Sequence, residues 1–297
     1  WNMCRWTEFM QCRTWPMRPV SFTTRICLKN MAGRFQPHGM NLLLCVKESK
    51  LKGFSRCILD SKIPGPVWLR GMRSLQIWLR LINKGNTTFT DNYREVAEKE
   101  KALLAYAQDN PAAYGYNDAC TAFAKGESAM FVIGSYAVPQ IKSVNPDMNI
   151  DSFVFPASNN AEENVLNSGN DLQFSIMKNC EHKEEAYEVL RFFMEDENVQ
   201  SYIDDQSAVP CKKGDFELPS MLDGMKEYIN EGKLADYQDH HYPSEMSVDA
   251  MIQTYLLDDS ENATDKFLKK FDTEWVRYNR ELIRKVQDYE KENGSNN

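Results

Sequence analysis

The side chains that could carry chemistry in this chain are mainly tyrosines and acidic residues in turn-rich segments. Tyr114 and Tyr116 stand in the string A-Y-G-Y-N-D, and Tyr242 follows two adjacent histidines in D-H-H-Y-P. Aromatic rings offer flat apolar faces with a polar tip, and carboxylates accept hydrogen bonds from hydroxyl groups. Packing inside the protein is the competing role of each ring, and for Tyr114 and Tyr116 it is the simpler one.

Catalytic and metal-binding motifs are absent from the sequence. None of the eight cysteines forms a C-x-x-C pair, and the adjacent His240 and His241 would face different ways on a strand and chelate poorly. No P-loop, G-x-G-x-x-G, H-E-x-x-H or nucleophile elbow is present. A glycosidase needs two carboxylates across a sugar, and 43 acidic residues offer many such pairs by chance. We therefore predict no catalytic residue, no metal and no cofactor.

Length and charge restrict the class of protein. A chain of 297 residues corresponds to about two domains. Its formal net charge of −8 argues against nucleic acid as a partner, since phosphate binding needs a basic surface. No stretch approaches the roughly 18 apolar residues of a membrane helix. The chain begins at Trp1 without a signal peptide, which indicates a mature form or a fragment.

Composition changes sharply near residue 80. The first 80 residues hold 14 basic and three acidic side chains, whereas the remainder holds 21 basic and 40 acidic ones. Five of the eight cysteines and five of the six tryptophans also precede residue 80. This part follows neither the helical nor the strand period, so it differs from ordinary globular sequence. A disulfide-linked domain there remains an alternative.

Regular elements are expected from about Lys84 onward. Thr90 and Asp91 can cap a helix that runs to about Asp109, and Asp118 can cap a short helix that Gly126 ends. Strands are expected over 128–133, 150–155 and 172–177, and helices over 183–194, 197–204, 219–230, 244–257 and 263–291. We expect the tail from Glu292 to be disordered. This mixture predicts an α/β fold.

Several strings, in order, resemble family-1 extracellular solute-binding proteins. The most specific is F-A-K-G-E-S-A-M-F-V-I-G-S-Y-A at 123–137, followed by S-G-N-D-L-Q-F-S-I-M-K-N-C at 168–180. A helix, E-E-A-Y-E-V-L-R-F-F-M, then precedes D-E-N-V-Q-S-Y and the loop Q-S-A-V-P at 206–210. The likeness covers about residues 82–290 and depends on the ordered series rather than on one motif.

The resemblance implies a two-lobed, type II periplasmic-binding-protein-like α/β fold, mainly the C-terminal lobe plus part of the N-terminal lobe. By that pattern the chain divides into four parts: an atypical segment over 1–81, C-terminal lobe over 82–165, a return into the N-terminal lobe over 166–212, and helices mainly of the C-terminal lobe over 213–297. The first segment of the N-terminal lobe has no counterpart here, so we expect an incomplete copy.

The resemblance also implies a function: an extracytoplasmic carbohydrate-binding protein, in bacteria often a lipoprotein, that delivers a mono- or oligosaccharide to ABC transporter permease subunits. Tyr136 stands where relatives often carry an aromatic that stacks on sugar, and Asp171 where they point a polar group into the cleft. Tyr116 and Tyr242 are further ligand candidates. A core role for Tyr136 and a turn role for Asp171 remain open. A sugar-sensing receptor domain and a carbohydrate-active enzyme are the alternatives.

Residues 1–81 can be interpreted as a frameshifted reading of the start of the C-terminal lobe. The shifted frame takes the third base of each codon together with the first two bases of the next codon. In that frame Met31–Ala32 must encode Gly and Met40–Asn41 must encode Glu. Around them the frame permits Y-N-K-D-M-F-E-E-H-G-W-K-I-P-T-T-W-D-E-F, and further along G-Y-K-D-S-W, both similar to the family. We predict that the family frame returns between about Gln76 and Lys84. A genuine divergent N-terminal domain is the alternative.

Overall fold

The structure, a computed structural model, describes residues 21–24, 57–58, 81–107, 114–155, 162, 164–168, 173–235 and 242–293. The strands are β1 (Ser21–Thr24), β2 (Cys57–Ile58), β3 (Met130–Phe131), β4 (Ile150–Phe153), β5 (Leu166–Asn167) and β6 (Leu234–Ala235). The α-helices are α6 (Phe89–Asn92), α7 (Arg94–Leu103), α8 (Tyr116–Ala124), α9 (Val138–Val144), α10 (Lys183–Phe193), α11 (Asp196–Gln206), α12 (Lys226–Asn230), α13 (Val248–Leu256), α14 (Ala263–Tyr278) and α15 (Arg280–Asn293). Short 3₁₀ helices are η1 (Leu104–Tyr106), η3 (Ser135–Ala137) and η5 (Ser220–Met225).

Four short strands form the main sheet, in the order β2-β3-β1-β4. β1 pairs antiparallel with both β3 and β4, and β2 pairs parallel with β3. The expected strand at 128–133 is confirmed as β3, whose two residues are both buried. Met130 packs into one apolar core and Phe131 into another, because consecutive side chains of a strand point to opposite faces.

The first apolar core lies between α6–α7 and α13–α14. The Phe89 ring meets Phe271 and Trp275 edge to face at centroid distances of 4.7 and 5.2 Å. The Tyr255 ring stacks on Phe267 at 4.6 Å, and its hydroxyl donates to the Ala97 carbonyl. Aromatic pairs of this kind stabilise by about 0.5–1.5 kcal/mol beyond their burial. Phe267, Phe271 and Trp275 of α14 are therefore core side chains.

The second core lies under α8 and α9, which cover the sheet. The rings of Phe123 and Phe131 meet at 5.6 Å, and Ile141 is fully buried beside them. On the neighbouring strand β4, the backbone of η5 approaches so closely that a Cβ on Gly224 would lie 2.0 Å from the Ser152 carbonyl oxygen. The Ser152 hydroxyl also donates to the Met221 carbonyl, which fixes η5 on this strand.

Several helix boundaries differ from the predicted ones. The short helix that Asp118 was expected to cap begins at Tyr116, with Gly115 as its N-cap. The long helix expected after Thr90 is broken at Tyr93, and its cap is Thr88, whose side chain accepts from the Asp91 amide. Thr90 instead donates to Asp272 of α14, because the tertiary contact brings that carboxylate to the start of α6. The helix expected over 263–291 is two helices that meet at Asn279.

The strand expected over 172–177 is wrong in its described part, 173–177, which is irregular and mostly exposed. No described strand lies beside it to accept its backbone hydrogen bonds, so the alternating pattern alone does not produce a strand. The tail prediction is wrong for Glu292 and Asn293, which continue α15. Residues 294–297 lie outside the described part.

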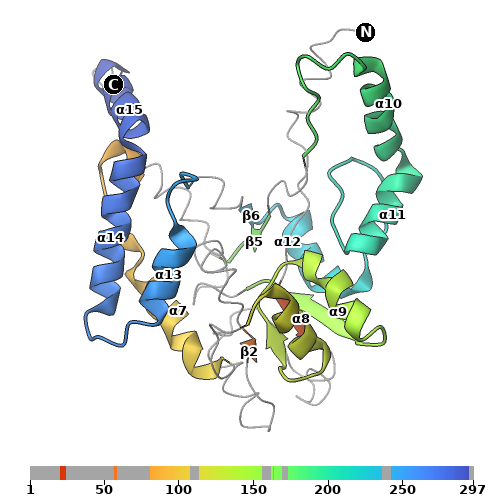
Figure 1. The fold of residues 1–297 in the computed structure, drawn as a ribbon, viewed down its shortest axis with the longest axis horizontal. Coiled ribbons are helices and arrows are strands. Elements are labelled where there is room, and N and C mark those ends of the chain that lie inside the picture. Colours follow the sequence, from red (N-terminus) through yellow and green to blue (C-terminus); the bar gives the residue numbers. More distant parts are fainter. Residues whose placement is uncertain are drawn as a thin grey trace.

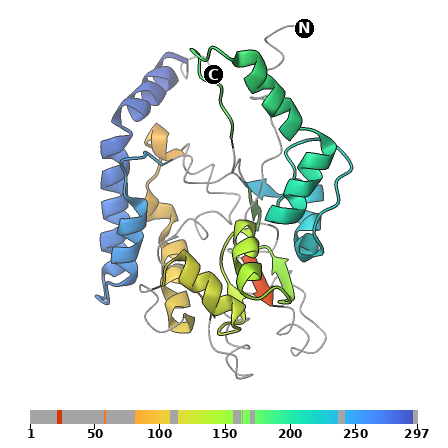
Figure 2. The same ribbon diagram turned by 45° about the vertical axis from the view of Figure 1, so that its right-hand side comes forward.

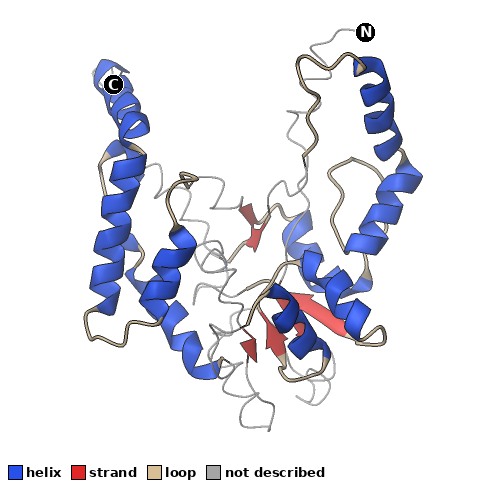
Figure 3. Ribbon diagram, in the orientation of Figure 1, coloured by secondary structure: helices blue, strands red, loops and turns tan. Residues whose placement is uncertain are grey.

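The helices form two arms that rise from the sheet region (Figure 1). One arm consists of α13, α14 and α15, and the other of α10 and α11, with α8 and α9 over the sheet between them. Figure 2 shows the same separation from a second side, and Figure 3 shows that helices make up most of both arms. Among the described residues, no helix is both long and apolar enough to span a bilayer.

Candidate functional site

Tyr136 is presented to solvent by a short 3₁₀ turn. Gly134 precedes η3 in an extended conformation, and the flanking Ser135 and Ala137 are both buried. Between these two anchors the Tyr136 ring is 38% exposed. A large aromatic held at its base but open on its outer side can serve as a stacking surface.

Tyr116 lies beside Tyr136, although twenty residues separate them in sequence. It is the first residue of α8, where Gly115 is the N-cap and the Asp118 carboxylate accepts from the Gly115 amide at 3.3 Å. The Tyr116 hydroxyl donates to the Tyr136 carbonyl at 3.4 Å, and the ring centroids are 6.1 Å apart with the planes tilted by 31°. The structure thus brings two predicted ligand residues into one aromatic pair, which we call the tyrosine pair.

Tyr242 lies elsewhere, packed against α14. Its half-buried ring meets Phe271 and Trp275 edge to face at 5.9 and 6.1 Å, so it belongs to the first core, whereas Tyr116 borders the second. Its own tyrosine neighbour Tyr93 lies in the same core, and burial raises the pKa of Tyr93 well above its usual value. The D-H-H-Y-P string gave no signal that distinguished this packing from a ligand contact.

Asp171 lies outside the described residues, but the strand before it is described. β5 and β6 pair in parallel, and the Ser168 amide donates to the Ala235 carbonyl at 2.6 Å. Within the described part of the chain, the buried side-chain oxygens of Asn167 and Ser168 have no hydrogen-bond partner. Such groups are costly to bury without a partner.

The loop Q-S-A-V-P follows α11 with an unusual backbone. Ser207 ends the helix in the left-handed conformation (φ 51°), a region that non-glycine residues seldom adopt. Ser207, Ala208 and Val209 are all buried. The small residues of this string therefore permit a tight helix end close to the second core.

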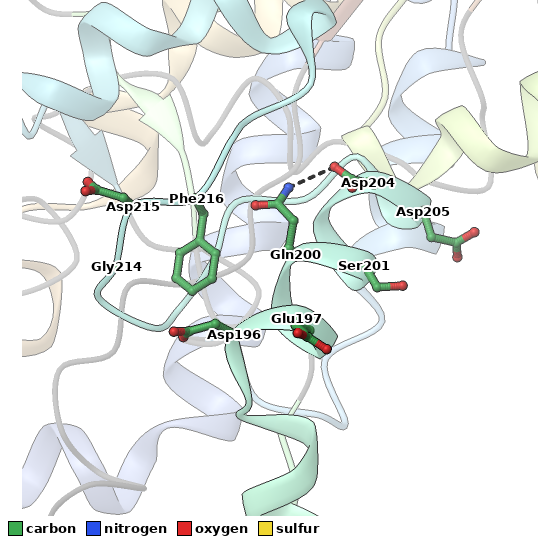
Figure 4. Close-up of a pocket in the computed structure, with 9 residues that line it drawn as sticks. All are labelled: Asp196, Glu197, Gln200, Ser201, Asp204, Asp205, Gly214, Asp215 and Phe216. Atoms are coloured by element: carbon green, nitrogen blue, oxygen red, sulfur yellow. Dashed lines mark hydrogen bonds between the residues drawn. The ribbon is translucent and has the colours of Figure 1, made fainter.

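A pocket of about 930 Å³ lies along α11, and none of the predicted ligand residues lines it (Figure 4). Asp196, Glu197, Gln200, Ser201, Asp204, Asp205, Gly214, Asp215 and Phe216 line it. Gln200 is held in place, since its side-chain amide donates to Asp204 at 2.9 Å and to the Glu217 carbonyl at 2.9 Å. The carboxylates are exposed, so they are solvated without a ligand. Sequence analysis missed this pocket because acidic residues on a helix usually mark a solvent face.

No described residues form a cluster that could hold a metal ion. Among the predicted ligand residues that the structure describes, Tyr116 and Tyr136 are the two that it brings together. The tyrosine pair is therefore the best-defined candidate site in the described chain. Chemically it offers aromatic faces and one hydroxyl, which can bind a ligand but cannot by themselves catalyse hydrolysis.

Residues 60–200 match the model of the family described as bacterial extracellular solute-binding protein. The predicted resemblance is confirmed. The chain is also 29% identical over 151 residues to the Multiple sugar-binding protein of Streptococcus mutans. That match covers 50% of this chain and 36% of the relative, so the matched part spans about a third of the curated solute-binding protein.

Solved structures show the same fold. RafE in complex with raffinose has a TM-score of 0.67 at 18% identity, covering 88% of this chain and 72% of that one. A chitin oligosaccharide binding protein has a TM-score of 0.72 at 17% identity, covering 91% and 71%. A sugar transporter protein from Bacillus licheniformis in complex with stachyose has a TM-score of 0.68 at 15% identity, covering 89% and 73%. The predicted α/β fold of the periplasmic-binding type is confirmed.

Proposed function

We propose that this chain is part of an extracytoplasmic carbohydrate-binding protein that delivers sugar to an ABC importer. The observation that carries the proposal is the family match over residues 60–200, which includes the tyrosine pair. Raffinose, stachyose and a chitin oligosaccharide appear in the names of the similar structures. An oligosaccharide is therefore the ligand class we assign.

The ligand site we propose contains Tyr136 and Tyr116, with Asp171 as the polar partner. A sugar ring presents C–H groups on its flat faces and hydroxyls around its edge, so an aromatic platform and a carboxylate are complementary to it. The exposure of Tyr136 and its fixed neighbour Tyr116 support this role. The packing of Tyr242 against Phe271 and Trp275 favours a structural role for that ring.

The mechanism we propose is capture without a chemical step. Sugar that binds better when two lobes are closed shifts the population toward the closed form, which docks on the permease. We assign 82–165 and most of 213–297 to one lobe and 166–212 to the other. Support comes from the cores, since α6–α7 pack on α13–α14, whereas α10 has no buried residue. Permease partners and an extracytoplasmic, lipid-anchored location follow from this function as part of the proposal.

A sugar-sensing receptor domain is the second candidate, because sensing would use the same ligand site. Permease genes beside this one favour import, whereas a histidine kinase gene favours sensing. A carbohydrate-active enzyme is the third candidate. Hydrolysis by such an enzyme would release reducing sugar, which the NMR experiment described next would detect.

The experiment is saturation-transfer NMR of the full chain with raffinose, stachyose and chitin oligosaccharides. We expect transfer to sugar protons that falls about tenfold in Tyr136→Ala, the loss expected for one stacking contact. Tyr289→Ala, a change at a 65% exposed ring on α15, is the control and should leave the signal unchanged. Absence of transfer from any sugar, or release of reducing sugar, would contradict the proposal.

A further inference from the structure

Glu100 is a buried carboxylic acid that the proposed sugar site does not use. It lies on the inner face of α7, is 7% exposed, and borders a cavity of about 10 Å³. The other residues that line this cavity are Phe89, Tyr93, Val96, Ala97, Phe267, Leu268 and Phe271. A carboxyl group is therefore enclosed by apolar and aromatic side chains where α7 packs on α14.

Tyrosines are the ionisable groups that neighbouring elements bring close to Glu100. Tyr93, at the junction of α6 and α7, lines the same cavity, and the Tyr242 ring packs against this core. Tyr255 of α13 donates its hydroxyl to the Ala97 carbonyl at 2.8 Å. A phenol carries no positive charge, so none of the three tyrosines can neutralise an ionised carboxylate.

The charged groups of α14 and α7 near this contact have other partners. On α14, Asp272 accepts hydrogen bonds from the first two amides of α6, and Asp265 pairs with Arg94. On α7, Glu98 is exposed beside Arg94, and Lys101 donates to a backbone carbonyl beyond α13. Burial without a compensating cation raises the pKa of Glu100 from 4.5 to about 8.

The cavity beside Glu100 is too small to hydrate an ionised carboxylate. A volume of about 10 Å³ is close to the least that admits one water molecule. An ionised carboxylate has about four lone-pair sites that accept hydrogen bonds, and burying it without such partners is costly. The ionised form therefore becomes stable only when α7 moves and water reaches Glu100.

The chain has a joint about which α7 can move. α6 and α7 are separate helices, since the backbone leaves the helical conformation at Tyr93 (φ −104°, ψ 3°). α6 is attached to α14 through Asp272, whereas the polar attachments of α7 include the half-exposed ion pair of Arg94 with Asp265 and the bond from the Tyr255 hydroxyl. Ion pairs at such exposure contribute little to stability. α7 can thus turn about Tyr93 while α6 keeps its place.

We propose that Glu100 is a pH-dependent switch in the contact of α7 with α13 and α14. Its protonated carboxyl keeps α7 closed on these helices. When the carboxyl releases its proton to solvent, α7 opens about the junction at Tyr93 and the carboxylate becomes hydrated. The opening is local and leaves the second core in place. The inference rests on the first core alone, so it can fail independently of the proposed sugar site.

The direction of the pH dependence follows from the proton that is released. Open α7 has an exposed glutamate with the ordinary pKa of 4.5, whereas closed α7 holds its proton up to about pH 8. The ratio of open to closed α7 should therefore rise about tenfold per pH unit between these two values. Acid keeps the contact closed, and alkali opens it.

Hydrogen exchange of the full 297-residue chain at pH 5, 6 and 7, followed by mass spectrometry on peptides from α7 and α8, tests the proposal. After correction for intrinsic exchange rates, the protection of α7 amides should fall about tenfold per pH unit. α8 packs in the second core, so its amides should be at least about tenfold better protected than those of α7 at pH 7. Equal loss of protection in α7 and α8 would overturn the proposal, because the opening would then be global unfolding.

Glu100→Gln and Glu100→Leu should each make the protection of α7 constant across this pH range, because neither side chain titrates. Two variants are used so that the result does not depend on how well one of them packs. Glu98→Gln is the matched control, since Glu98 has a 57% exposed side chain on the same helix and this variant should keep the slope. A constant protection of α7 in the unmodified chain, or a slope that persists without Glu100, would also overturn the proposal.

Discussion

Glu100 is an acidic side chain in an apolar surrounding. It lies on the inner face of α7, and Phe89, Val96, Phe267 and other side chains of the first core surround it. Burial raises the pKa of Glu100 from 4.5 to about 8, because the charged form loses its hydration. The sequence predicts a helix here but gives no reason to expect a carboxylate on its buried face.

This burial predicts a pH-dependent stability. Between pH 4.5 and about 8 the folded chain keeps a proton on Glu100 that the unfolded chain has lost, so stability falls as pH rises through that window. Glu100→Gln should remove this dependence and raise the free energy of unfolding at pH 8 by on the order of 2–4 kcal/mol. Urea unfolding of both proteins at pH 5 and pH 8 measures how the free energy of unfolding changes with pH. Glu98→Gln, an exposed change on the same helix, should keep the slope; an unaltered slope in Glu100→Gln would contradict the prediction.

Asp272 joins two helices far apart in sequence. Its carboxylate accepts from the Phe89 amide at 2.6 Å and the Thr90 amide at 3.2 Å, so α14 caps α6 across the first core. Asp272→Ala leaves these donors without a partner and should lower the free energy of unfolding by about 1–3 kcal/mol. Thermal melting with Asp288→Ala on the exposed side of α15 as control tests this. Equal melting temperatures for both variants would show that water replaces the cap.

At the scale of elements, the backbone of η5 packs closely on β4. A Cβ on Gly224 would lie 2.0 Å from the Ser152 carbonyl oxygen, and backbone atoms cannot rotate aside as a side chain can. Gly224→Ala should therefore separate η5 from the sheet and cost about 3 kcal/mol or more.

The control for Gly224→Ala is Gly126→Ala, at the turn after α8. Gly126 has a φ of +77° but no atom within 4 Å of an added Cβ, so that change should cost only about 1 kcal/mol. Urea unfolding of both variants gives the comparison. Similar losses would mean that η5 adjusts more readily than its contact indicates.

Helix existence was predictable from the sequence, whereas helix ends and breaks were not. The apolar period of α14 and the capping chemistry near α6 are local, and both helices are present. The break at Asn279 and the capping of α6 by Asp272 depend on packing between distant segments. The 173–177 segment shows the reverse case, because its alternation is correct for a strand but no described strand lies beside it. Tyr116 and Tyr136 were each predicted from the sequence as ligand residues. Their contact was not predictable, because it depends on the tertiary fold.

At the scale of the molecule, the first 81 residues remain a prediction. We predict that residues 1–80 lack a packed core of their own, and their side chains lie outside the described residues. β1 and β2 come from this part and pair with β3 and β4, yet backbone pairing needs no particular side chains. The family match begins at residue 60, inside the segment that the frameshift interpretation covers. Resequencing the DNA decides it, and an intact frame without an insertion or deletion would contradict the frameshift.

The whole chain should bind sugar weakly. Its matched part spans 36% of the curated relative, and Tyr136 is 38% exposed, so a sugar stacked on the tyrosine pair would keep much of its surface in water. Small-molecule sites usually bury roughly 70–90% of their ligand, and hydrogen bonds that compete with solvent contribute little net. We expect dissociation constants weaker than about 1 mM, near 4 kcal/mol of binding free energy.

Isothermal calorimetry of the full chain against raffinose, stachyose and chitin oligosaccharides measures this affinity. Tyr136→Ala should weaken the binding further, whereas Tyr289→Ala should not, since that ring lies exposed on α15. Micromolar binding by the 297-residue chain alone would show that its described residues already enclose the ligand, and the pocket along α11 would become the next site to mutate.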